Sequence, residues 1–320
     1  MTSSTTNTPH DWLRRLAGAG VVVVIAILAS SAYLRLTAVG FGCADWPLCY
    51  SLSGAAADGS GASFTGFARL VHRLSATAAG AIVFLVAFFS WVQSPRQRTD
   101  IAAAIALLVL TVFLAALGRS SGSVQAPGVV LGNLVGGMSM LLIMWWLYLR
   151  AARAAKPPSP SARRLAPWAI AVFVLAFIQI VLGALATGHR TALACEGFPD
   201  CGGIWWPPEL TLFDPLRDLH MQLTLVQTEG ARQALHMAHR FGALVLFVFV
   251  CILALRSLSC DKHERILPLA SLAIVLVQAG LGISAIELDL PLALIYSHHL
   301  GSIALLLAVS ATAQRATAND

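Results

Sequence analysis

The chain has 320 residues, of which 58% are hydrophobic and only 11% are charged, and its formal net charge is +6. A soluble domain usually carries about a quarter charged residues, so a chain this apolar cannot hide its side chains in one aqueous core. Its basic residues lie in short clusters between apolar runs, which is typical of topology signals in membrane proteins and excludes a nucleic-acid-binding surface.

Apolar runs long enough to span a bilayer, which takes about 20 residues, follow one another along the chain. We place them at 17–37, 67–92, 101–118, 128–149, 167–187, 233–255, 266–285 and 292–313. The segment before the first run is polar, and no small-residue cleavage site follows that run. We therefore interpret the first run as a retained transmembrane helix and not as a signal peptide. The sequence therefore predicts an all-α integral membrane protein with eight transmembrane helices.

The distribution of arginine and lysine predicts the orientation of these helices. With both termini cytoplasmic, the segments on that side hold Arg14, Arg15, Arg96, Arg98, Arg150, Arg153, Lys156, Arg163, Arg164, Arg256, Lys262, Arg265 and Arg315. The outer loops then hold only Arg119, Arg190, Arg217 and Arg232. Because basic residues are retained on the cytoplasmic side, we expect both termini there.

The chain reads as two similar halves, divided by the polar stretch AAKPPSPSARR. RLVHRLSA in the first half matches HMAHRFGA in the second, and AALG matches AGLG, with Pro127 and Pro291 nine residues after the last glycine. Gly137 and Gly301 are then in register. Internal similarity of this kind, with four helices per half, predicts a parallel repeat of two four-helix bundles. The expected parts are a tail at 1–16, a first bundle at 17–150, a linker at 151–166, a second bundle at 167–313 and a tail at 314–320.

Histidines inside the apolar runs are the candidate functional residues, because such side chains are costly at membrane depth. His239 and His298 lie seven residues beyond Arg232 and Pro291, which places each about 10 Å below the outer surface at 1.5 Å per residue. Two imidazoles at one depth in one bundle, with no carboxylate or thiolate set nearby, favour a haem iron with two axial histidine ligands.

Three further basic residues lie next to histidines of the apolar runs. Arg240, beside His239, suits a bidentate pairing with a haem propionate. His236 and Arg69 each lie three residues before a His-Arg pair, on the same helix face as the histidine. Either could support the histidine or bind a propionate, or could be an interfacial residue near the headgroups, and the sequence leaves both open.

The first half carries His72 where the second carries His239, again followed by an arginine, Arg73. The matching stretch of its fourth run, GNLVGGM, has no histidine, and Asn133 is the nearest polar residue. This half therefore offers at most one strong axial ligand. An open iron is expected where a haem is a substrate or an oxygen site, and equally in a site that has decayed.

Four of the six cysteines form two loops with the same C-x5-C spacing, on the outer side, where disulfides persist. We expect the pairs Cys43–Cys49 and Cys195–Cys201 to cap the bundles. A redox role stays open for the first pair, because short exposed disulfides can be reducible. The other two cysteines are expected to be inert thiols.

These segments together resemble the haem A synthase family, the cytochrome oxidase assembly proteins of respiring bacteria and mitochondria. The matching segments are LRLTAVG, CADWPLC, VHRLSA, ACEGFPDCGGIWWP, ARQALHMAHRFGA and HHLGSIALL. They cover nearly the whole chain and are specific in combination. The family's H-x-x-G-S run matches His298 to Ser302, which favours His298 over His299 as the ligand.

The resemblance implies an oxidoreductase that converts haem O to haem A by oxidising the C8 methyl group to a formyl group, with oxygen derived from water. The second half would hold haem b between His239 and His298, and the first half would bind haem O through His72, with Arg73 and Asn133 at the catalytic site. A haem O synthase would be a partner, cytochrome oxidase would receive the product, and an electron partner would be needed. The expected location is the bacterial cytoplasmic membrane.

The chain departs from the family pattern at two positions of the first half. The glutamate expected three residues before the first histidine is Arg69, and a second histidine expected on the fourth helix is replaced by Asn133. The second hypothesis is therefore a non-catalytic haem b-binding assembly or electron-transfer protein. A transporter is disfavoured, because its substrate site would lie near the midplane of an inverted repeat.

Overall fold

The computed structural model describes residues 9–38, 59–93, 97–120, 126–152, 159–195, 197–207 and 228–317. Its long helices are α1 (Pro9–Ala38), α2 (Gly59–Val92), α3 (Arg98–Ser120), α4 (Pro127–Ala152), α5 (Pro160–Gly188), α6 (Glu229–Ser257), α7 (Lys262–Glu287) and α8 (Leu292–Ala316). A short 3-10 turn, η2 (Thr191–Ala194), follows α5. All eight described long helices are long and apolar enough to cross a membrane, which confirms the predicted eight-span class.

Several helices begin earlier than the apolar runs suggest, because polar residues extend them beyond the lipid-compatible segment. α5 starts at Pro160, inside the stretch expected as a linker, and the Ser159 hydroxyl accepts a hydrogen bond from the main-chain N–H of Ala162. Proline suits a first helical turn, where its missing N–H costs no bond. α6 starts at Glu229 behind the same kind of serine or threonine cap, Thr228.

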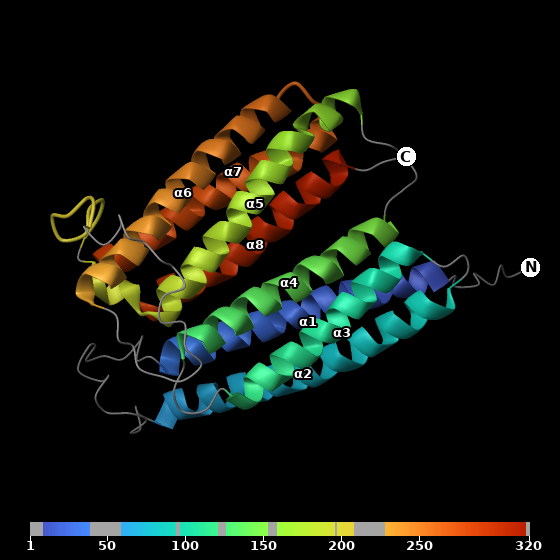
Figure 1. The fold of residues 1–320 in the computed structure, drawn as a ribbon, viewed down its shortest axis with the longest axis horizontal. Coiled ribbons are helices and arrows are strands. Elements are labelled where there is room, and N and C mark those ends of the chain that lie inside the picture. The colour runs from blue at the N-terminus through green and yellow to red at the C-terminus, as the bar shows by residue number, and fades with distance from the viewer. Residues whose placement is uncertain are drawn as a thin grey trace, which may run out of the picture.

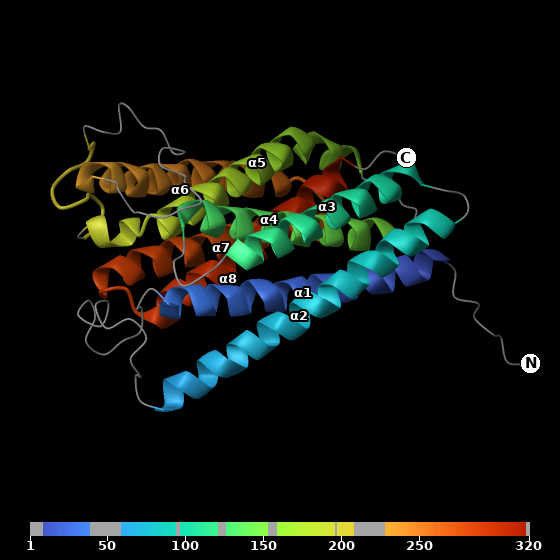
Figure 2. The same ribbon diagram turned by 60° about the horizontal axis from the view of Figure 1, so that its bottom comes forward.

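The helices form two groups of four, α1–α4 and α5–α8 (Figure 1). In the first group α1 contacts α2 and α4, and α3 contacts α2 and α4; in the second, α5 contacts α6 and α8, and α7 contacts α6 and α8. Each group is therefore a ring in which α2 faces α4, and α6 faces α8, across a diagonal. Figure 2 shows that α2 crosses α1 obliquely, so that the end of α1 and the start of α2 lie apart.

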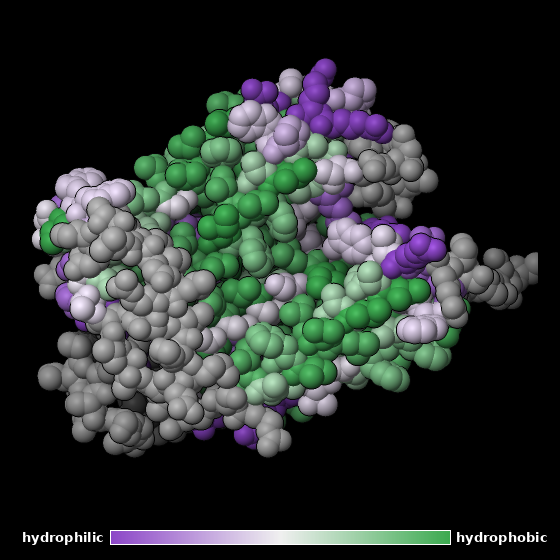
Figure 3. All heavy atoms as spheres, in the orientation of Figure 1, coloured by the Kyte–Doolittle hydropathy of each residue, from purple (hydrophilic) through white to green (hydrophobic). Residues whose placement is uncertain are grey.

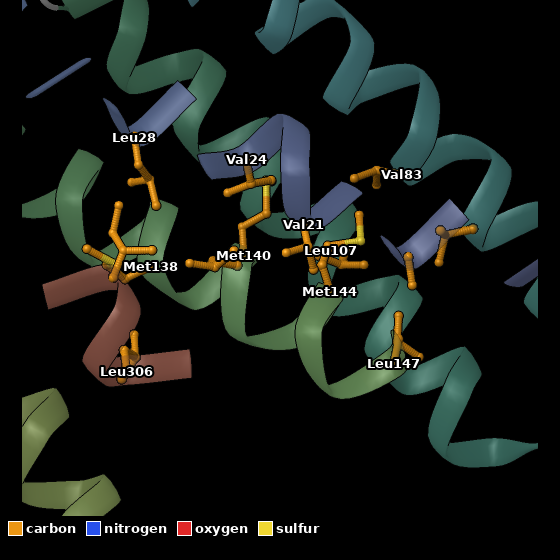
Figure 4. Packing of buried hydrophobic residues seen from close by; sticks show 14 of the residues in the cluster. Val21, Val24, Leu28, Val83, Leu107, Met138, Met140, Met144, Leu147 and Leu306 are labelled. Atoms are coloured by element: carbon orange, nitrogen blue, oxygen red, sulfur yellow. The ribbon is translucent and has the colours of Figure 1, made fainter. Parts of the chain in front are cut away.

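The two groups are joined along α4, α5, α1 and α8. The largest apolar core runs through α1–α4 and continues into α8, where Leu306 lies opposite Met138 (Figure 4). Trp145 of α4 donates its indole N–H to the main-chain oxygen of Leu307 at 3.1 Å, and Gln314 of α8 donates its amide to the main-chain oxygen of Trp146 at 3.2 Å. The groups thus share core packing and two polar links.

The outer surface of the bundle is apolar between polar ends. Large side chains such as Val112, Phe84 and Leu74 are more than 60% exposed. Figure 3 shows this hydrophobic surface across the helices, with hydrophilic side chains gathered near the end where α1 begins and α8 ends. Lipid covers such a surface at no hydrophobic cost, so the helices are one membrane-embedded unit.

Candidate functional site

The imidazoles of His239 and His298 meet in the core of the second helix group. They come from α6 and α8, which face each other across the diagonal of the ring. Their ring centroids lie 6.4 Å apart, and the ring planes make an angle of 69°. His239 lies ten residues after the start of α6, and His298 lies six residues after the start of α8. α6 therefore begins about one helical turn further from its histidine than α8 does.

The separation of the two rings fits a metal ion held between them. An imidazole nitrogen binds a first-row metal ion at about 2 Å, so two opposed imidazoles have nitrogens about 4 Å apart and ring centres roughly 6 Å apart. The described residues contain no group of three or more His, Cys, Asp or Glu side chains that could hold a metal ion by themselves. Two axial imidazoles with the remaining ligands supplied by a porphyrin satisfy both observations.

His298 is oriented by a hydrogen bond to the neighbouring helix. Its Nδ1 lies 3.1 Å from the main-chain oxygen of Gln278 on α7. A carbonyl oxygen only accepts, so Nδ1–H is the donor and Nε2 keeps its lone pair. This is the usual arrangement behind a metal-binding histidine, because the second nitrogen fixes both the tautomer and the direction of the ring.

His236 is buried one turn before His239 and is also oriented by a main-chain oxygen. Its Nδ1–H donates to the carbonyl of Thr191 in η2 at 3.0 Å, which leaves Nε2 as the acceptor nitrogen. The contact ties α6 to the turn that follows α5. This burial agrees with the supporting role, and the role of His236 toward a haem stays a prediction.

Arg240 is directed toward the loop that carries the second cysteine pair. Its guanidinium donates to the main-chain oxygens of Gly197 at 2.9 Å, Pro199 at 3.1 Å and Asp200. A guanidinium has five N–H donors, so these bonds use a large part of its capacity. The structure therefore gives Arg240 a loop-holding position, and the expected propionate contact stays a prediction.

The second cysteine pair lies where the spacing predicts it. Cys195 and Cys201 are within disulfide-bonding distance, with Cα atoms 4.5 Å apart, and both are buried against Met237 and Phe241 of α6. The loop consequently packs on the helix that carries His239. The first pair, Cys43 and Cys49, lies outside the described residues.

In the first helix group, His72 is half-buried on α2. Its Nδ1 lies 3.4 Å from the Ser30 hydroxyl of α1, and that hydroxyl donates its hydrogen to the main-chain oxygen of Ala26 at 2.7 Å. The serine oxygen is thus left to accept from Nδ1–H, which puts the lone pair of the neutral ring on Nε2. The two arginines expected beside it, Arg69 and Arg73, have exposed side chains.

Asn133 lies between the two helix groups. It lines a cavity of about 20 Å³ together with Arg35 of α1 and His299 of α8, a volume that takes about one water molecule. The Arg35 side chain is 8% exposed, and its Nε has no hydrogen-bond partner within the described structure. His299 therefore faces the first helix group, whereas its neighbour His298 faces His239.

Sequence reasoning singled out the histidines but missed two glutamines that touch them, Gln179 and Gln278. It also left Arg35 without a role. A signal for the glutamines exists in the sequence, since both begin a Q-x-x-L-G segment four residues before a glycine. Helix-buried amides are easily passed over, because a single glutamine carries no chemistry of its own.

The fold and the site together define the class: a polytopic helical membrane protein with an opposed histidine pair in the core of its second helix group. Comparison with known proteins then specifies it. A family profile described as cytochrome oxidase assembly protein, COX15-CtaA, matches residues 14–310. The chain belongs to the haem A synthase family.

The chain is similar to curated relatives over most of its length. It is 31% identical to a heme A synthase of Shewanella oneidensis, over 92% of this chain and 93% of the relative. It is 25% identical to a heme A synthase of Alkalihalophilus pseudofirmus, over 83% of each chain. It is also 25% identical to the human heme A synthase COX15, over 76% of this chain and 62% of the human protein.

Proposed function

We propose that this protein is a haem A synthase that converts haem O to haem A for cytochrome oxidase, with haem b bound between His239 and His298. The observation that carries the proposal is the opposition of these imidazoles at 6.4 Å in a chain of the haem A synthase family. The names of its relatives support the same oxidoreductase activity.

In the second helix group, the chain's own residues would hold haem b rigidly. His298 presents Nε2 because Nδ1–H is engaged by the carbonyl of Gln278. The loop pinned by Arg240 covers the outer end of α6. When bound, haem b supplies one-electron redox chemistry, and a dry, helix-lined surrounding tunes its potential.

In the first helix group, His72 would bind the substrate haem O through Nε2. Support comes from the Ser30 contact, which occupies Nδ1, and from α4, which lies diagonal to α2 and carries no histidine. Asn133 of α4 lines the cavity between the helix groups instead. An iron with one strong protein ligand keeps the other face open, as suits a molecule that must leave as product. The exposed side chain of Arg73 would be available to pair with a propionate.

The proposed setting is the bacterial cytoplasmic membrane with both termini inside. It is supported by the distribution of basic residues and by the start of α1 and the end of α8, which lie at the same end of the molecule (Figure 1). A haem O synthase would supply the substrate, cytochrome oxidase would receive the product, and an electron acceptor would complete the oxidation. The candidate disulfides would then both lie outside.

The test is conversion of haem O in a bacterial host that makes no haem A. The chain is co-expressed with a haem O synthase, and the extracted haems are separated by chromatography. Haem A is expected with the wild-type chain and is expected to be lost with His72→Ala, while haem b stays bound. Haem-loaded, monodisperse protein that yields no haem A would overturn the proposal.

Two substitutions favour a second candidate, a non-catalytic haem b protein of oxidase assembly or electron transfer. Arg69 stands at the position of a family glutamate and its side chain is exposed, and Asn133 replaces a histidine. This candidate predicts one low-spin haem b per chain and no difference in extracted haems between the wild type and His72→Ala. The same experiment therefore separates the two.

A further inference from the structure

Two glutamines hold the backbone of the two opposed histidines in the same way. Gln179 of α5 donates its side-chain amide to the main-chain oxygen of His239 on α6 at 2.9 Å. Gln278 of α7 donates its amide to the main-chain oxygen of His298 on α8 at 2.8 Å. Both bonds join adjacent helices at the level of an imidazole, so each histidine backbone is tied to the helix beside it.

A glycine lies against each imidazole, four residues after the glutamine. A Cβ atom on Gly183 would lie 3.3 Å from Cε1 of His239, and a Cβ atom on Gly282 would lie 3.3 Å from Cε1 of His298. These distances are tighter than ordinary van der Waals contact. The absence of a side chain at both glycines therefore lets each ring lie directly against the neighbouring helix.

A second glycine makes room for each glutamine, three residues after the histidine. A Cβ atom on Gly242 would lie 2.4 Å from Oε1 of Gln179, and a Cβ atom on Gly301 would lie 2.3 Å from Oε1 of Gln278. Any other residue would push the amide away from its histidine. The glutamine, the histidine and two glycines thus form one interlocked unit, present on α5–α6 and again on α7–α8.

The amide oxygens indicate that this unit is more than a link between helices. Oε1 of Gln179 and Oε1 of Gln278 are buried and have no hydrogen-bond partner within the described part of the chain. A buried unsatisfied polar atom is destabilising, and each such case in a native protein calls for an explanation. Retention of this cost at both equivalent positions points to a function in orienting the histidines.

We propose that Gln179 and Gln278 are positioning residues that set the orientation of the two axial imidazoles, an inference that rests on the proposed haem b site. Gln179 touches the ring as well as the backbone, because its amide nitrogen lies 3.1 Å from Nδ1 and 3.4 Å from Nε2 of His239. Gln278 acts twice on His298, since its main-chain oxygen accepts from Nδ1–H and its side chain holds the carbonyl. The rings are fixed with their planes 69° apart.

The orientation of the rings has a spectroscopic consequence that a merely structural role would not have. In an oxidised haem with two imidazole ligands, nearly perpendicular ring planes give a strongly anisotropic low-spin electron paramagnetic resonance signal, and parallel planes give a less anisotropic one. Outer groups that orient ligand histidines also tune the reduction potential. The unit therefore predicts a strongly anisotropic signal for the wild-type chain.

The experiment compares Gln179→Leu and Gln278→Leu with Gln314→Leu in the full-length, haem-loaded protein. Leucine keeps approximate volume and removes the amide. Gln314 is the matched control, because it also donates its amide to a main-chain oxygen on another helix but lies near the opposite end of α8 from His298. We expect retained haem in all three variants. The largest g value of the electron paramagnetic resonance signal and the midpoint potential of the haem should shift in the first two variants, most in Gln179→Leu. Both should stay at wild-type values in Gln314→Leu.

A glycine pair on one helix gives a second, independent comparison. Gly282→Ala would press a methyl group on the His298 ring, whereas Gly280→Ala lies two residues earlier on α7 with nothing within 4 Å of its Cβ. We expect the resonance signal to shift in Gly282→Ala alone. This pair decides the matter if either leucine variant fails to fold, because alanine favours a helix at both positions.

The outcomes separate this inference from the proposed function. Wild-type protein without a low-spin haem that has two histidine ligands would overturn the haem b proposal and this inference with it. Wild-type protein with such a haem, and with unchanged signals and potentials in Gln179→Leu, Gln278→Leu and Gly282→Ala, would overturn the positioning role alone.

Discussion

Arg35 of α1 and His299 of α8 line one small cavity between the two helix groups. Because His299 shares this cavity with Arg35, its side chain points toward the first helix group. The adjacent His298 points toward His239 in the second group. Successive residues of a helix point about 100° apart, so the two histidines cannot serve the same side. This relationship leads to the first prediction.

Substitution of His298 should change the haem content, whereas substitution of its neighbour His299 should not. We expect His298→Leu to lose the low-spin haem b spectrum, because it removes one of two opposed imidazoles. His299→Leu should keep the spectrum, because that ring lies toward Arg35. Optical spectra and haem-to-protein ratios of the purified variants measure this. Retained haem in His298→Leu with loss in His299→Leu would reassign the ligand.

The indole of Trp145 should contribute to cohesion between the helix groups. Trp145→Phe removes the hydrogen bond from the indole N–H to the main-chain oxygen of Leu307. We expect a loss of about 1 kcal/mol in the free energy of unfolding, with haem content unchanged. Thermal unfolding in detergent measures it. Trp205→Phe, at an exposed loop tryptophan, is the control and should leave the melting temperature unchanged.

Cys195 and Cys201 should be linked in the purified protein. Without reduction, an alkylating reagent is expected to leave both unmodified, and mass spectrometry should find them in one cross-linked peptide. Replacing both by serine should destabilise the short loop by about 2 kcal/mol on a chain-entropy basis. Protease cleavage within 197–207 should then become faster. Two alkylated thiols at these positions in unreduced wild-type protein would refute the linkage.

The Cys260 thiol, which follows α6, should be protected from alkylation at neutral pH. Burial raises the pKa of this thiol above its ordinary value, so less thiolate is present at a given pH. The other free cysteine of the described residues, Cys251 of α6, is replaced by serine so that it does not react. The alkylation rate should then keep rising with pH beyond the point where the rate for the unfolded chain levels off. Stability linked to the neutral thiol is complete below the unfolded pKa and declines above roughly pH 8.5. Equal pH profiles for folded and unfolded protein would contradict this.

The class and the spans could be predicted from the sequence alone, and the sequence also named the candidate ligands. Hydropathy predicts the eight spans because a bilayer accepts only helices of about 20 apolar residues, whatever packs beside them. His72, His239 and His298 stood out because polar side chains are rare at that depth. The helix starts were less predictable, as α5 shows, because polar turns continue a helix beyond the lipid.

Which of these residues lie close together depends on the packing of the helices. The facing of His239 and His298, the direction of His299 and the bonds of Gln179 to His239 depend on the rotation of each helix about its axis and on its neighbours in the ring. Hydropathy is an average over a whole span and carries little of that information. Arg240 illustrates the difference, since its partners are carbonyl oxygens of a loop some 40 residues earlier in the chain. Interhelical packing, which joins residues distant in sequence, fixed the geometry of the site.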